Sequence, residues 1–471
     1  MKVPAFKMLV EKKHSPYAMK EQTVSTDITR IRDKARQYPK LVFTSLYHHV
    51  TDIDNLRECY KLLDGNKSTG IDRVNKIEYG KNLRENLQDL SNRLKRMGYR
   101  PQPKRRVYIP KPGSNKLRPL GISSFEDKIV ELAIKQAIEP LFEPLFEECS
   151  YGYRPGRNPH QCIKALGLTI QRQKVNYIVE ADVRSFFDKV NHEWLIKFLK
   201  QRIGDPRVLR VIMRMLKAGI MENGQRQEGK MGTPQGSILS PLLSNVYMHY
   251  VLDLWFHKRM RRRFRGQAFL FRFADDFLAC FQYEDDAENF YASLKERLEG
   301  FNLQLAEEKT RKIPFGRFAR ERAYHKGTKP MEFDFLGFTF YCGKTKSGHF
   351  KVKRKTSKKK FRQSLLNFTD WLRKYRSSIP TGKLVCQAKA RIQGHLNYYA
   401  VTDNMKTCGL YKHLAERILF KWLNRRSQRN SYNWAGFLQM LNHVGRPQSR
   451  VQVDINPCWH DSEYFKRRAG C

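Results

Sequence analysis

Apolar and polar positions change their spacing along the chain, and this spacing predicts where strands and helices lie. Residues 177–183 (YIVEADV) read as a buried strand, followed by a turn and a helix capped by Asn191. Residues 269–282 (FLFRFADDFLACFQ) alternate phenylalanines, break at an Ala-Asp step and then resume, which predicts a β-hairpin with carboxylates at its tip. Such strand-like runs alternate with helical stretches from about residue 41 to 341, so we predict an α+β core there.

The C-terminal part has helical spacing. Apolar residues recur three and four positions apart in two stretches, which places one apolar stripe on each of two helices: Phe361, Leu365, Phe368, Leu372 and Tyr375, and then Tyr411, Leu414, Ile418 and Trp422. We expect a small basic helical domain at 346–426. A short separate module is expected at 427–471, with Trp434, Phe437 and Leu438 as its core.

Charge narrows the choice of partner. The 471 residues carry a formal net charge of +44, and such a surplus repels itself unless a polyanion neutralises it. Nucleic acid is therefore the expected partner. A content of 40% hydrophobic and 12% aromatic residues excludes a disordered basic protein. Half of the surplus lies in residues 341–471, with 28 Lys plus Arg against 6 Asp plus Glu, and its densest run is 351–362 (KVKRKTSKKKFR). That run is either a solvated loop or a binding surface.

Hydropathy and cysteine spacing argue against a membrane protein and a zinc protein. No window approaches eighteen uninterrupted apolar residues, and the first residues carry no visible targeting signal, so we expect a cytoplasmic protein without a membrane partner. The nine cysteines are scattered without a C-x2-C pair, which predicts free, mostly buried thiols and no zinc site.

Three acidic residues stand out in this basic chain. Asp275 and Asp276 lie side by side within a run of phenylalanines, where two unpaired carboxylates would be costly, so a cation is expected beside them. Asp182 ends the other strongly apolar strand, and if the two strands are neighbours the carboxylates share one edge of the sheet. Oxygen ligands of this kind suit a pair of Mg²⁺ ions. The alternative is that Asp275-Asp276 is an ordinary turn dipeptide.

The motifs around these residues, taken in order, resemble those of reverse transcriptases. The turn 273–276 (FADD) resembles the Y/F-x-D-D motif of that family. Six further blocks match the family's blocks in sequence order: 67–74 (KSTGIDRV), 106–157, 182–188 (DVRSFFD), 232–240 (GTPQGSILS), 303–312 and 335–340 (FLGFTF). The resemblance implies a right-hand polymerase, with fingers and palm over residues 41–345, an antiparallel palm sheet and a helical thumb.

Several blocks resemble one branch, the group II intron-encoded reverse transcriptases and maturases. Residues 41–66 resemble its extra N-terminal block, preceded here by an extension at 1–40, and residues 151–158 (YGYRPGRN) are typical of it. The resemblance makes 346–426 the thumb or maturase (X) domain and 427–471 a DNA-binding (D) domain. Because no Cys- and His-rich zinc module is seen, the resemblance is to the endonuclease-lacking type.

The family resemblance also implies roles for individual residues. Asp182, Asp275 and Asp276 are the expected catalytic residues and hold two Mg²⁺ ions, with Val183 adding its carbonyl. Substrate-binding residues are expected at Lys111 and Arg118 in a fingers hairpin, at Phe187, which excludes a ribose 2′-hydroxyl, at Gln235 and at Lys309, a candidate proton donor to pyrophosphate. Lys111 and Arg118 could instead be ordinary surface charges, and Phe187 a core aromatic beside Phe186. Lys358, Lys359 and Lys360 are expected to bind RNA.

The implied activity is RNA-directed DNA synthesis on an RNA template with a DNA primer and dNTPs. Its implied partners are a group II intron RNA, whose splicing it assists, and a target DNA. Phe273 replaces the tyrosine common in group II proteins, which removes a hydroxyl near the primer terminus but leaves metal binding untouched. Two competing interpretations are a domesticated or defence-associated reverse transcriptase without an intron, and a non-enzymatic RNA-binding splicing factor. The second is disfavoured because the expected catalytic residues are all present.

Overall fold

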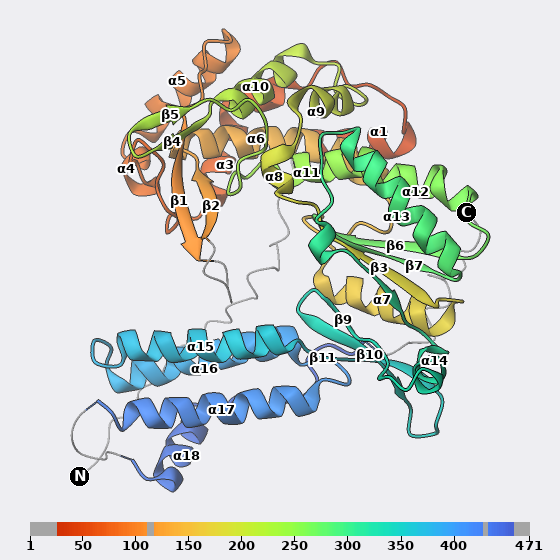
Figure 1. Cartoon of the computed structure of the whole chain (residues 1–471). Helices are drawn as coiled ribbons and strands as arrows, with labels where there is room; N and C mark the ends of the chain where they lie inside the picture. The colour runs from red at the N-terminus through yellow and green to blue at the C-terminus, as the bar shows by residue number, and fades with distance from the viewer. Residues whose placement is uncertain (1–25, 111–116, 427–431, 456–471) are drawn as a thin grey trace, which may run out of the picture.

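The structure is a computed structural model that describes residues 26–110, 117–426 and 432–455 (Figure 1). It combines helices with three β-sheets, so the predicted α+β class is confirmed. No helix among the described residues is both long and apolar enough to cross a membrane. The described cysteines are all free, and six of these seven are buried, as the sequence predicts.

The first four-stranded sheet lies in the N-terminal half, with strand order β2-β1-β4-β5. Strands β1 (Lys104–Pro110) and β2 (Leu117–Ile122) form an antiparallel hairpin, while β4 (Ile220–Glu222) runs parallel to β1 and antiparallel to β5 (Gln225–Gln227). Helices accompany this sheet: α1 (Thr26–Gln37), α2 (Tyr47–Thr51), α3 (Ile53–Leu62), α4 (Lys76–Gly80), α5 (Leu83–Lys95), α6 (Phe125–Phe142) and α10 (Pro206–Lys217).

The second sheet is antiparallel throughout, with strand order β6-β7-β3-β8. Its strands are β3 (Tyr177–Ala181), β6 (Ala268–Phe273), β7 (Asp276–Phe281) and β8 (Arg311–Pro314). Helices α7 (Pro159–Arg172) and α13 (Glu284–Glu299) cover its opposite faces (Figure 1). Successive residues of β7 therefore enter different cores: Phe277 and Phe281 pack in one hydrophobic cluster, Leu278 and Cys280 in the other.

Short helices connect these layers. They are η1 (Glu143–Leu145), α8 (Phe186–Lys189), α9 (His192–Leu199), α11 (Ser240–Met248), the π-helix η2 (His249–Asp253), α12 (Leu254–Lys258), η3 (Met260–Arg262), η4 (Glu307–Lys309) and α14 (Ala319–His325). Polar residues fix where several helices begin. The predicted cap of α9 is confirmed, because the Asn191 side chain accepts a hydrogen bond from the amide of Trp194. Asn158 forms a capping box with Gln161 at the start of α7.

The C-terminal part consists of a small sheet and a helical bundle. The sheet has strand order β11-β10-β9, with β9 (Phe333–Phe335), β10 (Phe338–Lys344) and β11 (Phe350–Thr356). The bundle contains α15 (Lys358–Tyr375), α16 (Thr381–Tyr399) and α17 (Met405–Leu423) and lies across from the β1–β2 hairpin in Figure 1. Both predicted helices are confirmed, and α16 is a third helix between them. The bundle's apolar residues join the hydrophobic cluster that covers the α7 side of the β6-β7-β3-β8 sheet.

The basic run at 351–362, for which a solvated loop was the alternative, forms β11 and the first turns of α15. The expectation of a separate C-terminal module is corrected. Residues 432–455 are not separate: helix α18 (Trp434–His443) buries Phe437 in the same cluster as the bundle, and Arg446 pairs with buried Glu416 of α17 at 2.7 Å. Trp434 is not a core residue, since 37% of it is exposed. Its ring lies on the surface against Phe420 and Phe437.

Candidate active site

The predicted hairpin with carboxylates at its tip is confirmed. Strands β6 and β7 are joined by a two-residue turn, with Phe273 opposite Asp276 in the ladder. We call residues 273–276 the acidic turn. Strand β3 is the other neighbour of β7, and Ala181 lies opposite Phe277, so Asp182 leaves β3 at the end of the sheet where the acidic turn lies. The expectation that these strands are neighbours is thus also confirmed.

The acidic turn forms one wall of a cavity of about 580 Å³. Arg118 from β2, Phe187 from α8 and Gln235 line the same cavity, as do Asp275 and Asp276. Lys360 of α15 and Tyr398 and Tyr399 of α16 line it as well. Residues from six separate parts of the chain therefore meet at the place where the sequence predicts a substrate.

Asp182 and Lys309 lie beside this cavity and contact each other. The Lys309 ammonium donates a hydrogen bond to the Asp182 carboxylate, which raises the pKa of Lys309. The backbone amide of Ala306 donates to the carbonyl of Asp182 at 2.8 Å, so the segment before η4 is tied to the end of β3. The Val183 side chain is buried, which leaves only its backbone to take part in binding. Lys111 lies outside the described residues.

Neighbouring negative charge and burial act together on the acidic turn. Loss of surrounding water raises the pKa of Asp275, and the Asp182 carboxylate raises it further, while Arg118 and Arg272 oppose the shift. The same causes raise the pKa of Asp276 to about 7, with Asp275, Asp182 and Glu180 all contributing negative charge. The carboxylates of Asp275 and Asp276 therefore lie in surroundings that disfavour their negative charge.

The donor chemistry fits a divalent cation. Carboxylate oxygens are the ligands that Mg²⁺ prefers, and a cation would relieve the repulsion that raises both pKa values. Within the described ranges, no group of three or more His, Cys, Asp or Glu side chains is arranged to enclose a metal ion as the side chains lie. Asp182 instead faces the Lys309 ammonium, so this carboxylate would have to exchange partners when a metal ion binds.

Backbone contacts hold Gln235 and Phe187 in place around the cavity. The amide of Gly121 in β2 donates to the carbonyl of Gln235 at 2.7 Å, which ties the Gln235 loop to the strand that carries Arg118. Gly236 has a φ of +106° and approaches this strand so closely that a Cβ would lie 2.9 Å from the Gly121 carbonyl oxygen. The amide of Thr233 donates to the carbonyl of Phe187 at 2.7 Å. One loop thus positions both side chains.

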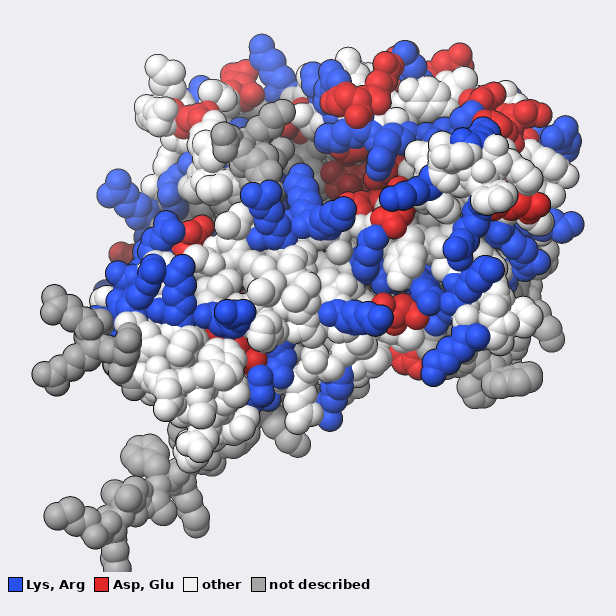
Figure 2. All heavy atoms as spheres, turned by 60° about the horizontal axis from the view of Figure 1, so that its bottom comes forward, with Lys and Arg blue, Asp and Glu red and all other residues white. Residues whose placement is uncertain are grey.

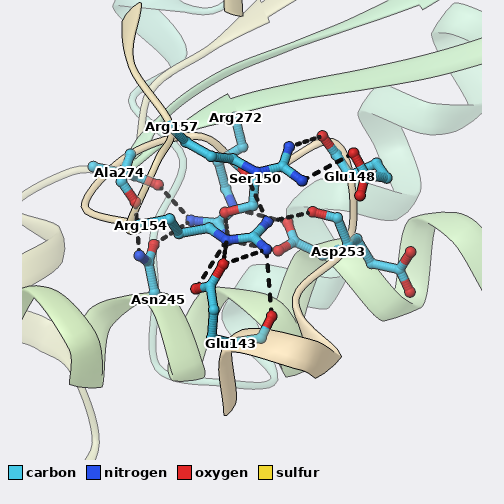
Figure 3. A network of polar contacts seen from close by, with 11 residues as sticks. Glu143, Glu148, Ser150, Arg154, Arg157, Asn245, Asp253, Arg272 and Ala274 are labelled. Carbon is cyan, nitrogen blue, oxygen red and sulfur yellow. Dashed lines mark hydrogen bonds and ion pairs between the residues drawn. The ribbon is translucent and has the colours of Figure 1, made fainter. Parts of the chain in front are cut away.

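Sequence reasoning missed the residues that hold the acidic turn. Arg272 is fully buried, and its guanidinium binds Asp253, Asn245, Ser150 and the carbonyl of Ala274 (Figure 3). The sequence does carry a signal for a buried, bonded arginine, since Arg272 is the one charged residue of the otherwise apolar strand β6. Sequence reasoning also passed over Tyr153, which is 53% exposed, has a φ of +58° and lines the cavity beside Phe187.

Comparison with known proteins defines the class of this site. Residues 109–340 match the family model of reverse transcriptase (RNA-dependent DNA polymerase). The matched part contains Arg118, Phe187, Gln235, all three aspartates and Lys309. It implies the right-hand polymerase fold that the motifs predict.

Individual relatives agree with the branch that the motifs indicate. The group II intron-encoded protein LtrA of Lactococcus lactis subsp. cremoris is 37% identical over 233 residues, which is 48% of this chain and 38% of LtrA. Protein YkfC of Escherichia coli is 34% identical over 227 residues, 47% of this chain and 59% of YkfC. The putative COX1/OXI3 intron 1 protein of Saccharomyces cerevisiae is 32% identical over 170 residues, which is 36% of this chain and 20% of that protein. The resemblance to group II intron-encoded proteins is confirmed, and these alignments span 20% to 59% of the relatives' lengths.

Proposed function

We propose that the protein is an RNA-directed DNA polymerase that binds a group II intron RNA, assists its splicing as a maturase and copies it into DNA. The observation that carries this proposal is the cavity in which the acidic turn meets Arg118, Phe187, Gln235 and Lys360. The matched reverse transcriptase family and the intron-encoded relatives support it. A defence-associated enzyme without an intron is not favoured by these relatives.

The proposed reaction is attack of a primer 3′-hydroxyl on the α-phosphate of a dNTP opposite an RNA template. Two Mg²⁺ ions held by Asp182, Asp275 and Asp276, with the Val183 carbonyl, would supply positive charge to the reacting oxygens. Arg118 neutralises the triphosphate together with Lys111. Phe187 occupies the space of a ribose 2′-hydroxyl, Gln235 contacts the nucleotide, and Lys309 donates a proton to pyrophosphate.

We propose the same division of the chain that the motifs imply. Residues 1–40 are an extension, 41–345 are fingers and palm, 346–426 are the thumb or maturase domain, and 427–471 bind the target DNA. Lys358, Lys359 and Lys360 are exposed at the start of α15, and Lys360 reaches the cavity wall, which supports RNA binding at this helix. The apolar stripes of α15 and α17 pack into the hydrophobic cluster of the C-terminal part.

Replacing the central carboxylate tests this function. Asp275→Ala should abolish Mg²⁺-dependent primer extension on an RNA template while leaving RNA affinity nearly intact, because the affinity comes from phosphate contacts elsewhere. Asp285→Ala is the matched control, since Asp285 is an exposed aspartate on α13 with 72% of its side chain accessible. Extension by Asp275→Ala above a few per cent of wild type would rule out the metal-binding role.

A further inference from the structure

The guanidinium of Arg272 uses every donor it has. Its Nε and Nη2 donate to the two carboxylate oxygens of Asp253 at 2.7 and 2.5 Å. Its Nη1 donates to Asn245 Oδ1 at 3.0 Å and to the carbonyl oxygen of Ala274 at 2.9 Å, and its Nη2 also donates to Ser150 Oγ at 2.7 Å. An arginine has five N–H groups, so none is left over for substrate or solvent. Arg272 therefore acts by holding other parts of the protein and does not bind substrate.

One of these bonds fixes the residue directly before Asp275. Ala274 has a φ of +61°, in the left-handed region that a residue with a Cβ atom disfavours. The bond from Arg272 Nη1 to the Ala274 carbonyl holds this conformation in place. Asp275 follows at once in the chain, so the direction of its side chain depends on how Ala274 is held.

The segment around Gly152 closes the other side of the acidic turn. A Cβ at Gly152 would lie 2.3 Å from the amide nitrogen of Ala274, so only glycine permits this approach. Asn245 Nδ2 donates to the Gly152 carbonyl at 2.7 Å, and the amide of Tyr151 donates to the Arg272 carbonyl at 2.9 Å. Figure 3 shows Asn245, Ser150 and Asp253 converging on Arg272 from separate elements.

A π-helical turn brings two of these partners to the same guanidinium. Asn245 belongs to α11 and Asp253 ends η2, eight positions later. In a regular α-helix residues eight apart differ in direction by roughly 80°, because each residue advances the helix by about 100°. The wider turn of η2 changes this register, and both side chains contact Arg272.

We propose that Arg272, held by Asp253 and Asn245, is a positioning residue that keeps Ala274 in its left-handed conformation and so sets the Asp275 carboxylate for catalysis. This inference rests on the proposed polymerase function and adds to it a residue that does not touch the substrate. The palm residues then have two separate roles: the aspartates bind the metal ions, and the buried network of Arg272 fixes the orientation of Asp275.

Substitution of Arg272 by lysine tests the inference. Arg272→Lys keeps a positive charge beside Asp253 but cannot also reach Ala274, so kcat for primer extension should fall roughly 10- to 100-fold, as expected for a small misplacement of a reacting group. The KM for dNTP and the RNA affinity should stay within about threefold of wild type, because the bonds of Arg272 go to Asp253, Asn245, Ser150 and Ala274 and not to the residues proposed to bind dNTP and RNA. Loss of RNA affinity in proportion to kcat would overturn the inference.

A second substitution distinguishes positioning from plain stability. Glycine adopts a φ of +61° without help, so in the Ala274→Gly background Arg272→Lys should cost less than about threefold in kcat. The matched control is Arg202→Lys: Arg202 is about equally buried, donates to the carbonyls of Ala35, Tyr38 and Leu141 and lies over the Phe43 ring, and these residues are not among those that line the cavity. This control should lower the melting temperature without lowering kcat. Equal losses of kcat in both residue-274 backgrounds would overturn the inference.

The failure of either claim can be recognised. A wild-type protein without primer extension contradicts the proposed function, whereas an active wild type with an unaffected Arg272→Lys variant contradicts only the positioning role. If Arg272→Lys does not fold, Asn245→Ala carries the same test, because it removes the link between Arg272 and Gly152 and leaves the ion pair with Asp253 intact. Its kcat loss should likewise shrink in the Ala274→Gly background, and an unchanged loss would again overturn the inference.

Discussion

The acidic turn and the start of α15 face the same cavity but differ in how firmly the surrounding structure holds their charged side chains. Behind the acidic turn, the guanidinium of Arg272 is buried and fixed by five hydrogen bonds, while Asp276 at the turn is exposed. At the start of α15, Lys358, Lys359 and Lys360 are exposed, and within the described part of the chain none of them forms an ion pair. The first region specifies geometry and the second supplies charge.

This difference matches what each region would have to recognise. A reacting phosphate must meet ligands within a fraction of an ångström, so its partners need a rigid scaffold. A nucleic-acid backbone offers a charge at every nucleotide, so mobile lysines at the surface suffice. Figure 2 shows Lys and Arg side chains spread over most of one face of the molecule, while acidic side chains form a few clusters. A single substitution should therefore cause a large loss of primer extension at the acidic turn, whereas each lysine replaced at α15 should cause only a small loss of RNA affinity.

The largest effects are expected at the metal-binding carboxylates, at Asp182 as at Asp275. Asp182→Asn should reduce primer extension by roughly three orders of magnitude, since a metal-binding carboxylate contributes several kcal/mol to the transition state. Single-turnover extension at saturating dNTP measures this loss. Glu308→Gln, which breaks an exposed ion pair with Arg184 on the segment that carries Lys309, serves as the control and should stay near wild type. A loss below tenfold for Asp182→Asn would contradict its place in the site.

The next effect concerns discrimination between sugars. Phe187→Ala should raise the use of rNTPs relative to dNTPs by roughly 10- to 100-fold, because discrimination by shape alone is of this order. The ratio of kcat/KM for the two nucleotide types measures it. Phe186→Leu is the matched control, because the neighbouring ring is buried in the core and should affect stability but not sugar choice. Unchanged discrimination in a folded Phe187→Ala protein would make Phe187 a core residue.

The pH dependence should reflect Asp276. Its pKa is raised to about 7, so without metal the carboxylate takes up a proton as the pH falls through 7 and competes with Mg²⁺ binding. We expect the Mg²⁺ concentration for half-maximal extension to rise as the pH falls from 8 to 6.

The raised folded-state pKa of Asp276 also means that the stability of the metal-free protein decreases as the pH rises from about 4 to 7. Asp276→Asn should remove this part of the stability change in a melting experiment without metal, and an unaltered pH profile would contradict the assignment.

The smallest effect is expected at α15. Replacing Lys358, Lys359 and Lys360 by glutamine should weaken RNA binding several-fold and lower the slope of log K against log salt by about 0.7 to 0.9 for each RNA phosphate that these lysines neutralise in the wild type. Lys351→Gln with Lys355→Gln is the matched control in the same basic run, because these lysines already pair with Asp403 and Glu332. An unchanged salt slope for the triple variant would make this end of α15 a solvated surface.

The two regions also differ in how well the sequence predicted them. The acidic turn was predictable because alternating phenylalanines and a break at Ala274 define a hairpin, and the neighbouring strand ends at Asp182. The apolar stripes of α15 and α17 were equally clear. Helix α16 was missed, because Gly382 and Gly394 and several polar residues interrupt its pattern.

What local patterns could not predict depends on contacts between distant parts of the chain. The partners of Arg272 come from residues 150, 245 and 253, and nothing in the spacing of these residues shows that they meet. The packing of residues 432–455 was missed for the same reason, since Phe437 of α18 contacts Phe420 of α17 and Arg446 pairs with Glu416 of α17. In the basic run, charge density left a solvated loop open as an alternative, whereas the run forms strand β11, in which alternate residues are buried.

The division between geometry and charge is tested most directly by measuring rate and affinity on the same samples. Single-turnover primer extension and RNA affinity as a function of salt would be determined for wild type, Asp275→Ala and the triple variant of Lys358, Lys359 and Lys360. We predict that Asp275→Ala loses extension and keeps the affinity and salt slope of wild type, while the triple variant loses affinity and slope and keeps the rate at saturating RNA. Loss of RNA affinity in Asp275→Ala, or loss of the saturated rate in the triple variant, would contradict this account.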